Sequence, residues 1–126
     1  MILSTVLIMV LASIISDNPP RLQAGAAKRI ITPQSSVYLA GWSSNRKSEG
    51  VHDDLFARCL LVDNGQIQIG FLSLDLLGVT RLQNMEIQKL CRETGVLPDH
   101  LIIMATHQHS GPDTIGLWGP DETTSG

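Results

Sequence analysis

The sequence predicts an α/β fold, namely a mixed sheet that contains a β-hairpin and a right-handed β-α-β unit. Three observations carry this prediction. Several apolar runs have the length of strands, an Asn-Gly pair separates two of them, and a capped helical segment separates the last two. No closing strand or helix follows His109, so we expect a fragment of a larger α/β domain.

Four stretches are rich in apolar and β-branched residues and predict strands: Leu22–Thr32, Leu55–Val62, Ile67–Leu76 and Leu101–Thr106. Asn64-Gly65 lies between the second and third stretches. We expect a type I′ turn there, with positive φ at both central residues, and therefore an antiparallel hairpin.

A helix is predicted over residues 80–94. Thr80 and Gln83 form a capping box, and Gly95 supplies the C-terminal cap. The expected apolar stripe consists of Leu82, Met85, Leu90 and Cys91. Because this helix joins two strands, those strands should be parallel, with a right-handed crossover.

The first 18 residues differ from the rest of the chain. Met1 to Ile15 is almost wholly apolar without a charged side chain, and the run ends at Asp17. It is shorter than the ~20 residues of a spanning helix and matches a signal-peptide core. We expect a signal peptide or membrane anchor over 1–18, hence a secreted, extracytoplasmic or membrane-anchored protein. A buried N-terminal element or a wrongly assigned start is the alternative.

Composition excludes some functions. The chain has 126 residues, a net charge of −3 and 4% aromatic residues. It therefore lacks the basic surface and the stacking side chains typical of nucleic-acid binding. Cys59 and Cys91 fit neither a disulfide framework nor a zinc knuckle, and we interpret them as small buried hydrophobic residues.

The candidate site begins where the last predicted strand ends. His107 and His109 follow an apolar run and precede Ser110-Gly111-Pro112, which should stop the strand. In an extended chain, residues i and i+2 point to the same side with Cα atoms ~6.6 Å apart, so both imidazoles could bind one zinc ion. A histidine at a strand end is otherwise a solvated or hydrogen-bonded residue. A catalytic zinc needs at least one further ligand from elsewhere.

Asp75 lies near the end of the preceding predicted strand. A carboxylate in an apolar run needs a partner or a cation, although a helix cap or turn former is the open alternative. If the two strands are parallel neighbours, Asp75 and both histidines share one edge of the sheet. Arg58 and His52 are weaker candidates, since a strand-face and a loop position explain them equally well.

The chain resembles the N-terminal part of the neutral (neutral/alkaline, non-lysosomal) ceramidase family over residues 22–113. The last of the matching segments is the most specific. The segments are Ala24–Pro33, Leu39–Trp42, Gly50–Arg58, Leu74-Asp75 and Ala105–Pro112. Residues 19–126 would then form the N-terminal portion of a ceramidase-like catalytic domain.

The resemblance implies a zinc-dependent hydrolase that cleaves the N-acyl amide bond of a sphingolipid-like substrate. It assigns His107 as a Zn²⁺ ligand. Asp75 and His109 are the catalytic candidates, which would orient a ligand or face the lipid-like substrate. The family's other ligands and its serine nucleophile are expected beyond Gly126.

Two alternatives remain open. One is a catalytically incomplete, membrane-anchored or secreted fragment without activity, and the other is a binding module for lipid or protein. The loop at 34–50 and the segment Asp113–Trp118 depart from the family pattern. We therefore expect a hydrolase of the ceramidase type and leave its substrate open.

Overall fold

We analysed a computed structural model, which describes residues 21–43, 45–95 and 98–119. The predicted signal peptide or anchor lies outside these residues. Within them, no helix is both long and apolar enough to cross a membrane.

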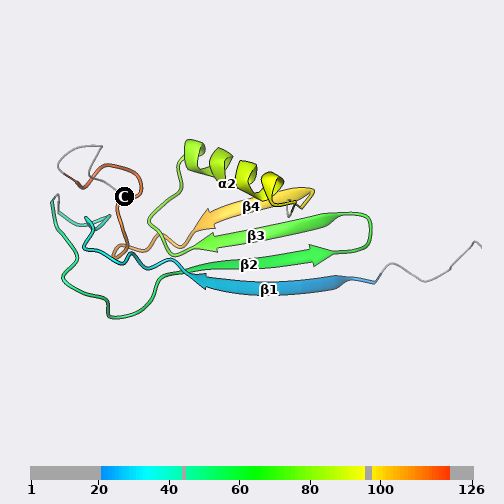
Figure 1. Ribbon diagram of the computed structural model, residues 1–126, viewed down its shortest axis with the longest axis horizontal. Helices are drawn as coiled ribbons and strands as arrows, with labels where there is room; N and C mark the ends of the chain where they lie inside the picture. Colours follow the sequence, from blue (N-terminus) through cyan, green and yellow to red (C-terminus); the bar gives the residue numbers. More distant parts are fainter. Residues whose placement is uncertain (1–20, 44, 96–97, 120–126) are drawn as a thin grey trace, which may run out of the picture.

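The described part of the chain contains one mixed four-stranded sheet (Figure 1). Its strands, in spatial order, are β1 (Gln23–Ile30), β2 (Phe56–Asp63), β3 (Gln68–Leu74) and β4 (His100–Ala105). The pairs β1–β2 and β2–β3 are antiparallel, whereas β3–β4 is parallel. Helix α2 (Arg81–Glu93) joins β3 to β4. The predicted α/β fold, with a hairpin followed by a β-α-β unit, is confirmed.

The hairpin turn has a different geometry from the predicted one. Asp63 pairs with Gln68, so four residues form the turn. Gly65 has φ +84°, but Asn64 does not have a positive φ, and the type I′ prediction is wrong. The reason is that the Asn64 side-chain oxygen accepts bonds from the backbone N–H groups of Gln66 and Ile67, at 3.0 and 2.9 Å. These bonds favour a wider turn.

Helix α2 begins with the predicted capping box. Gln83 N–H donates to Thr80 Oγ1 at 3.3 Å, and Thr80 N–H donates to Gln83 Oε1 at 2.9 Å. Thr94 is the C-cap residue, and Gly95 follows it with positive φ.

The predicted apolar stripe of α2 is wrong in its orientation. Leu82, Met85 and Leu90 are exposed, and only Cys91 of the stripe is half-buried. Gln83 Nε2 donates to Thr114 O at 2.6 Å, which fixes the rotation of the helix at its first turn. The half-buried face therefore carries Gln83, Asn84, Ile87, Gln88 and Cys91.

Buried side chains gather at one end of the sheet. We call residues 31–55 and 106–119 the loop layer; they lie beyond the carboxyl ends of β3 and β4 (Figure 1). Ala40 and Leu55 from this layer are buried, as are Leu74 and Leu77 at the end of β3 and just beyond it. The packed part of the described structure is thus the part that carries the candidate site.

Candidate functional site

The ends of β3 and β4 lie side by side, as predicted. Leu74 pairs with Ala105 in the parallel ladder. The chain then continues alongside residues 74–77, because Thr106 N–H donates to Leu74 O at 2.9 Å and Gln108 N–H donates to Leu76 O at 3.1 Å. Asp75 and the two histidines therefore share one edge of the sheet.

His107 is not in an extended conformation. Its φ is +62°, in the left-handed region, so the predicted alternation of side chains from 107 to 109 is wrong. The strand ends at Ala105, two residues before His107 and well before Gly111 and Pro112. His107 Nδ1 lies 3.0 Å from Leu77 O. A carbonyl oxygen only accepts hydrogen bonds, so Nδ1 carries the proton of this bond, and in the neutral imidazole the lone pair lies on Nε2.

The two imidazoles are neighbours despite the change in backbone. Their ring centroids are 5.0 Å apart and their planes meet at 70°. Both residues are exposed. The sequence thus predicted the closeness of the rings, but through a backbone geometry that the chain does not adopt.

Gly41 contacts His109 from the opposite loop, which the sequence did not predict. Its φ is +78°, and a Cβ placed on it would lie 2.6 Å from both Cγ and Nδ1 of His109. The Gly41-Trp42 pair stood out in the sequence, but no local signal connects it with a residue 68 positions later.

Asp75 is paired with Arg58. One nitrogen of the guanidinium, Nη1, lies 2.7 Å from both carboxylate oxygens, and Phe56 N–H donates to Oδ2 at 2.9 Å. Thr106 Oγ1 lies 3.5 Å from Oδ1. Burial raises the pKa of Asp75, but the bonds from Arg58 and Phe56 and the charge of Arg58 outweigh it and lower the pKa below its usual value.

These contacts confirm that the Asp75 carboxylate has a partner, which is one part of the prediction. Its carboxylate has partners, as burial in an apolar run requires, and it caps no helix. Among the residues that the structure describes, none of its hydrogen bonds goes to a histidine. Its catalytic role stays a prediction.

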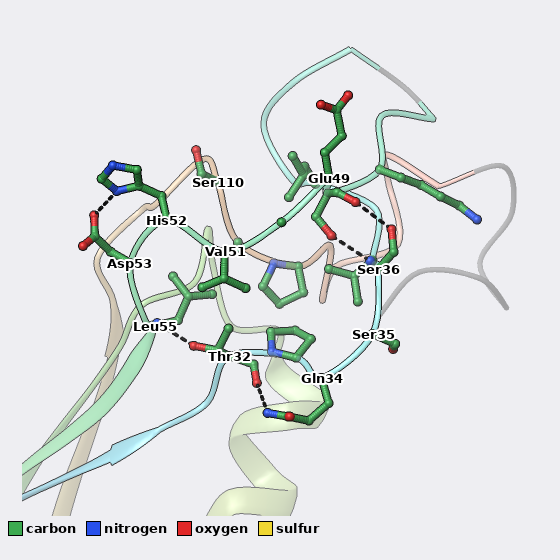
Figure 2. A pocket seen from close by; sticks show the side chains of 18 of the residues that line it. Thr32, Gln34, Ser35, Ser36, Glu49, Val51, His52, Asp53, Leu55 and Ser110 are labelled. Atoms are coloured by element: carbon green, nitrogen blue, oxygen red, sulfur yellow. Dashed lines mark hydrogen bonds and ion pairs between the residues drawn. The ribbon is translucent and has the colours of Figure 1, made fainter.

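A cavity of about 670 Å³ lies in the loop layer. Residues 32–37, 46–53 and 110–112, together with Leu39, Leu55 and Gln108, line it. His52 and Asp53 lie at its mouth near Ser110 (Figure 2), and His52 Nδ1 is 2.6 Å from Asp53 Oδ2. This hydrogen bond, with the charge of Asp53, raises the pKa of His52. Neither His107 nor His109 is among the residues that line the cavity.

Asp113 organises the end of the loop layer. It is fully buried and accepts hydrogen bonds from four backbone N–H groups, those of Ile115, Gly116, Trp118 and Gly119. Burial raises the pKa of Asp113, but the four bonds outweigh it and lower the pKa below its usual value. In the sequence this residue was only a departure from a family pattern.

The donor set for a metal is incomplete within the described residues. His107 and His109 bring two imidazoles together, but no group of three or more His, Cys, Asp or Glu side chains in residues 21–43, 45–95 and 98–119 is placed to hold a metal ion. The cysteines are separated from this edge, on β2 and α2, and neither forms a disulfide.

Two solved structures resemble the chain. A neutral ceramidase from Pseudomonas aeruginosa matches with a TM-score of 0.67 and 25% sequence identity, over 76% of this chain and 16% of that one. A ceramidase complexed with C2 matches with a TM-score of 0.65 and 24% identity, over 72% of this chain and 15% of that one. No protein-family model matches the sequence. The predicted resemblance to neutral ceramidases is confirmed, for a chain that spans about one sixth of their length.

Proposed function

We propose that this chain forms the N-terminal part of the catalytic domain of a zinc-dependent hydrolase of the neutral ceramidase type. The reaction is cleavage of the N-acyl amide bond of a sphingolipid-like substrate. One observation carries the proposal. In a chain similar to neutral ceramidases, the Nδ1–H of His107 donates to Leu77 O, and the His107 ring adjoins that of His109 at the carboxyl edge of the sheet.

The chemistry of His107 fits a zinc ligand. Metal-binding histidines commonly donate their second ring N–H to a carbonyl or carboxylate, which fixes the tautomer and the ring orientation. The Leu77 carbonyl does this for His107, and neutral imidazole is a ligand that zinc prefers. When bound, zinc would act as a Lewis acid on the amide carbonyl.

His109 and Asp75 have different tasks in this proposal. The exposed imidazole of His109 adjoins His107 and faces the substrate, where it can exchange a hydrogen bond or a proton with the amide. Asp75 acts on position. It joins the ends of β2 and β3 through Arg58 and Phe56 and lies beside Thr106, the residue before His107.

The substrate class and the location are further parts of the proposal. A similar ceramidase was solved in complex with C2, which supports a lipid-like substrate and a role in sphingolipid metabolism. The apolar segment Met1–Ile15 supports secretion or anchoring at a membrane, where such a substrate resides. The remaining zinc ligands and the nucleophile would come from outside the described residues.

A second candidate is a fragment of the same fold that has no hydrolytic activity of its own. The two-imidazole donor set within the described residues favours this alternative for the 126-residue chain in isolation. A zinc titration and a graft experiment distinguish the two candidates.

The titration uses the 126-residue chain with ¹⁵N-labelled histidine. We expect weak zinc binding that shifts Nε2 of His107, and a loss of affinity of about tenfold or more in His107→Ala. His52→Ala is the matched control, because His52 is an exposed histidine bonded to Asp53, and it should leave the titration unchanged. Equal affinity in wild type and His107→Ala would contradict the ligand assignment.

The graft places this chain in the Pseudomonas ceramidase in place of the matched segment. Hydrolysis of a short-chain ceramide that disappears with His107→Ala supports the hydrolase. A folded graft that retains zinc without hydrolysis supports the inactive fragment.

A further inference from the structure

The backbone of Gly41 forms one wall of the space that His109 occupies. We propose that Gly41 is a positioning residue, whose missing side chain sets the orientation of the His109 imidazole against His107. This inference rests on the proposed function, because that function makes His109 a residue of the site.

The steric argument is direct. A Cβ at position 41 would lie 2.6 Å from His109 Cγ and Nδ1 and 3.0 Å from Cδ2. Carbon atoms in contact are normally ~3.5–4.0 Å apart. Cγ is the ring atom bonded to Cβ, so rotation of the ring about the Cβ–Cγ bond does not move it. A small shift at the tip of the side chain therefore cannot relieve the contact, and the whole ring must turn away or the two backbones must separate.

The backbone of residue 41 has little room to retreat. Ala40 is fully buried, and its N–H donates to Gly111 O at 3.1 Å. Asp113 N–H donates to Tyr38 O at 2.8 Å, and Leu39 and Pro112 form a β-bridge between these two bonds. Residues 38–40 are thus attached to 111–113, two to four positions after His109. A clash at position 41 should therefore displace the ring, because the segment before Gly41 is bonded to the segment after His109.

The ring of His107 serves as a fixed point against which the orientation of the His109 ring can be measured. It is fixed independently by the Leu77 carbonyl, and the two ring planes meet at 70° with centroids 5.0 Å apart. Gly41 contacts His109 and not the His107–Leu77 bond. A side chain at position 41 should therefore change the angle between the rings while leaving the tautomer of His107 as it is.

The chain offers a matched control at Gly65. Its φ of +84° is close to the +78° of Gly41, but a Cβ there would meet nothing within 4 Å. Gly65→Ala introduces the same left-handed backbone strain in open space. The difference between Gly41→Ala and Gly65→Ala isolates the contact with His109.

The experiment compares these variants by NMR of the metal-free 126-residue chain. In Gly41→Ala we expect the ring-to-ring NOEs between His107 and His109 to disappear and the His109 ring signals to shift. The Nδ1–H signal of His107 should stay in place. Gly65→Ala should leave both rings as in wild type. Unchanged ring signals and NOEs in Gly41→Ala would overturn the proposal.

A second readout covers the case in which Gly41→Ala fails to fold. In a His109→Ala background the ring is absent, so Gly41→Ala should lower the denaturation midpoint only as much as Gly65→Ala does. A larger and equal loss in both backgrounds would overturn the proposal. A graft whose hydrolysis survives His107→Ala defeats the proposed function and leaves these readouts intact. Hydrolysis that depends on His107, together with unchanged rings in Gly41→Ala, defeats this inference alone.

Discussion

The loop layer and the sheet of this protein differ in where fully buried side chains occur. In the loop layer Ala40 and Asp113 are fully buried, although loops usually run over a protein surface. In the regular elements, large apolar side chains such as Leu60 on β2, Met104 on β4 and Leu82 on α2 are exposed. Within the described residues, fully buried side chains lie in the loop layer near the candidate site, whereas large apolar side chains on the sheet and on α2 are exposed.

Backbone hydrogen bonding explains the difference. The two halves of the loop layer exchange bonds between Ala40 and Gly111 and between Tyr38 and Asp113. The Asp113 carboxylate then satisfies four N–H groups of the following turn. The loop layer is therefore held together by backbone and carboxylate hydrogen bonds of its own.

The largest expected effect is on the free energy of unfolding, when a buried leucine is replaced and compared with an exposed one. Leu77 is 8% exposed beside the loop layer, whereas Leu82 on α2 is 77% exposed. Leu77→Ala should lower the free energy of unfolding by about 3 kcal/mol, because it leaves a cavity. Leu82→Ala should cost less than about 0.5 kcal/mol. Urea denaturation of both variants measures the difference, and similar losses would show that the two regions are packed alike.

A smaller effect is expected from the buried carboxylate. Asp113→Asn removes the charge that four N–H groups share, and we expect a loss of about 2–3 kcal/mol. Because folding lowers the pKa of Asp113, its contribution is complete above the unfolded value of about 3.9 and disappears as the pH falls through the lower folded pKa.

Unfolding measured between pH 7 and pH 2 checks the sign. The wild-type chain should lose stability below about pH 4, and Asp113→Asn should lose less over the same range. Glu86→Gln, which removes an exposed carboxylate on α2, should follow the wild-type curve. Parallel curves for wild type and Asp113→Asn would refute the role of the charge.

The smallest effect concerns the N-terminal cap of α2, next to the bond that joins this helix to the loop layer. Thr80→Ala removes the capping box and should cost about 1 kcal/mol. Thr80→Ser keeps a capping hydroxyl and should restore most of this loss. Thermal denaturation of both variants measures it. An unaffected Thr80→Ala chain would mean that the bond from Gln83 to Thr114 suffices to orient the helix.

Local signals in the sequence predicted the regular elements well. The capping box at Thr80 and Gln83 specifies the start of the helix, and the Asn64-Gly65 pair marks the hairpin. A helix between two strands implies their parallel order. The turn type was wrong because the Asn64 side chain bonds the backbone, and the exposed stripe of α2 was wrong because tertiary contacts set the rotation of the helix.

The site itself was only partly predictable. The order of the strands places Asp75, His107 and His109 at one edge. Histidine is enriched at positive φ, but this preference does not distinguish position 107 from position 109. The partner of His109 lies in another loop, and those of Asp113 are backbone N–H groups. The contact between Gly41 and His109 arises from the meeting of two loops, which no periodicity in the sequence reports.

The left-handed backbone of His107 has a consequence for protein design. An L-residue other than glycine costs about 1–2 kcal/mol in this conformation, and Asn or Gly would tolerate it better. A redesign guided by thermostability alone would therefore replace the histidine that carries the proposed chemistry. At position 107 the backbone conformation favours another residue, whereas the proposed zinc ligation requires histidine, so automated stabilisation of this scaffold should keep His107 fixed.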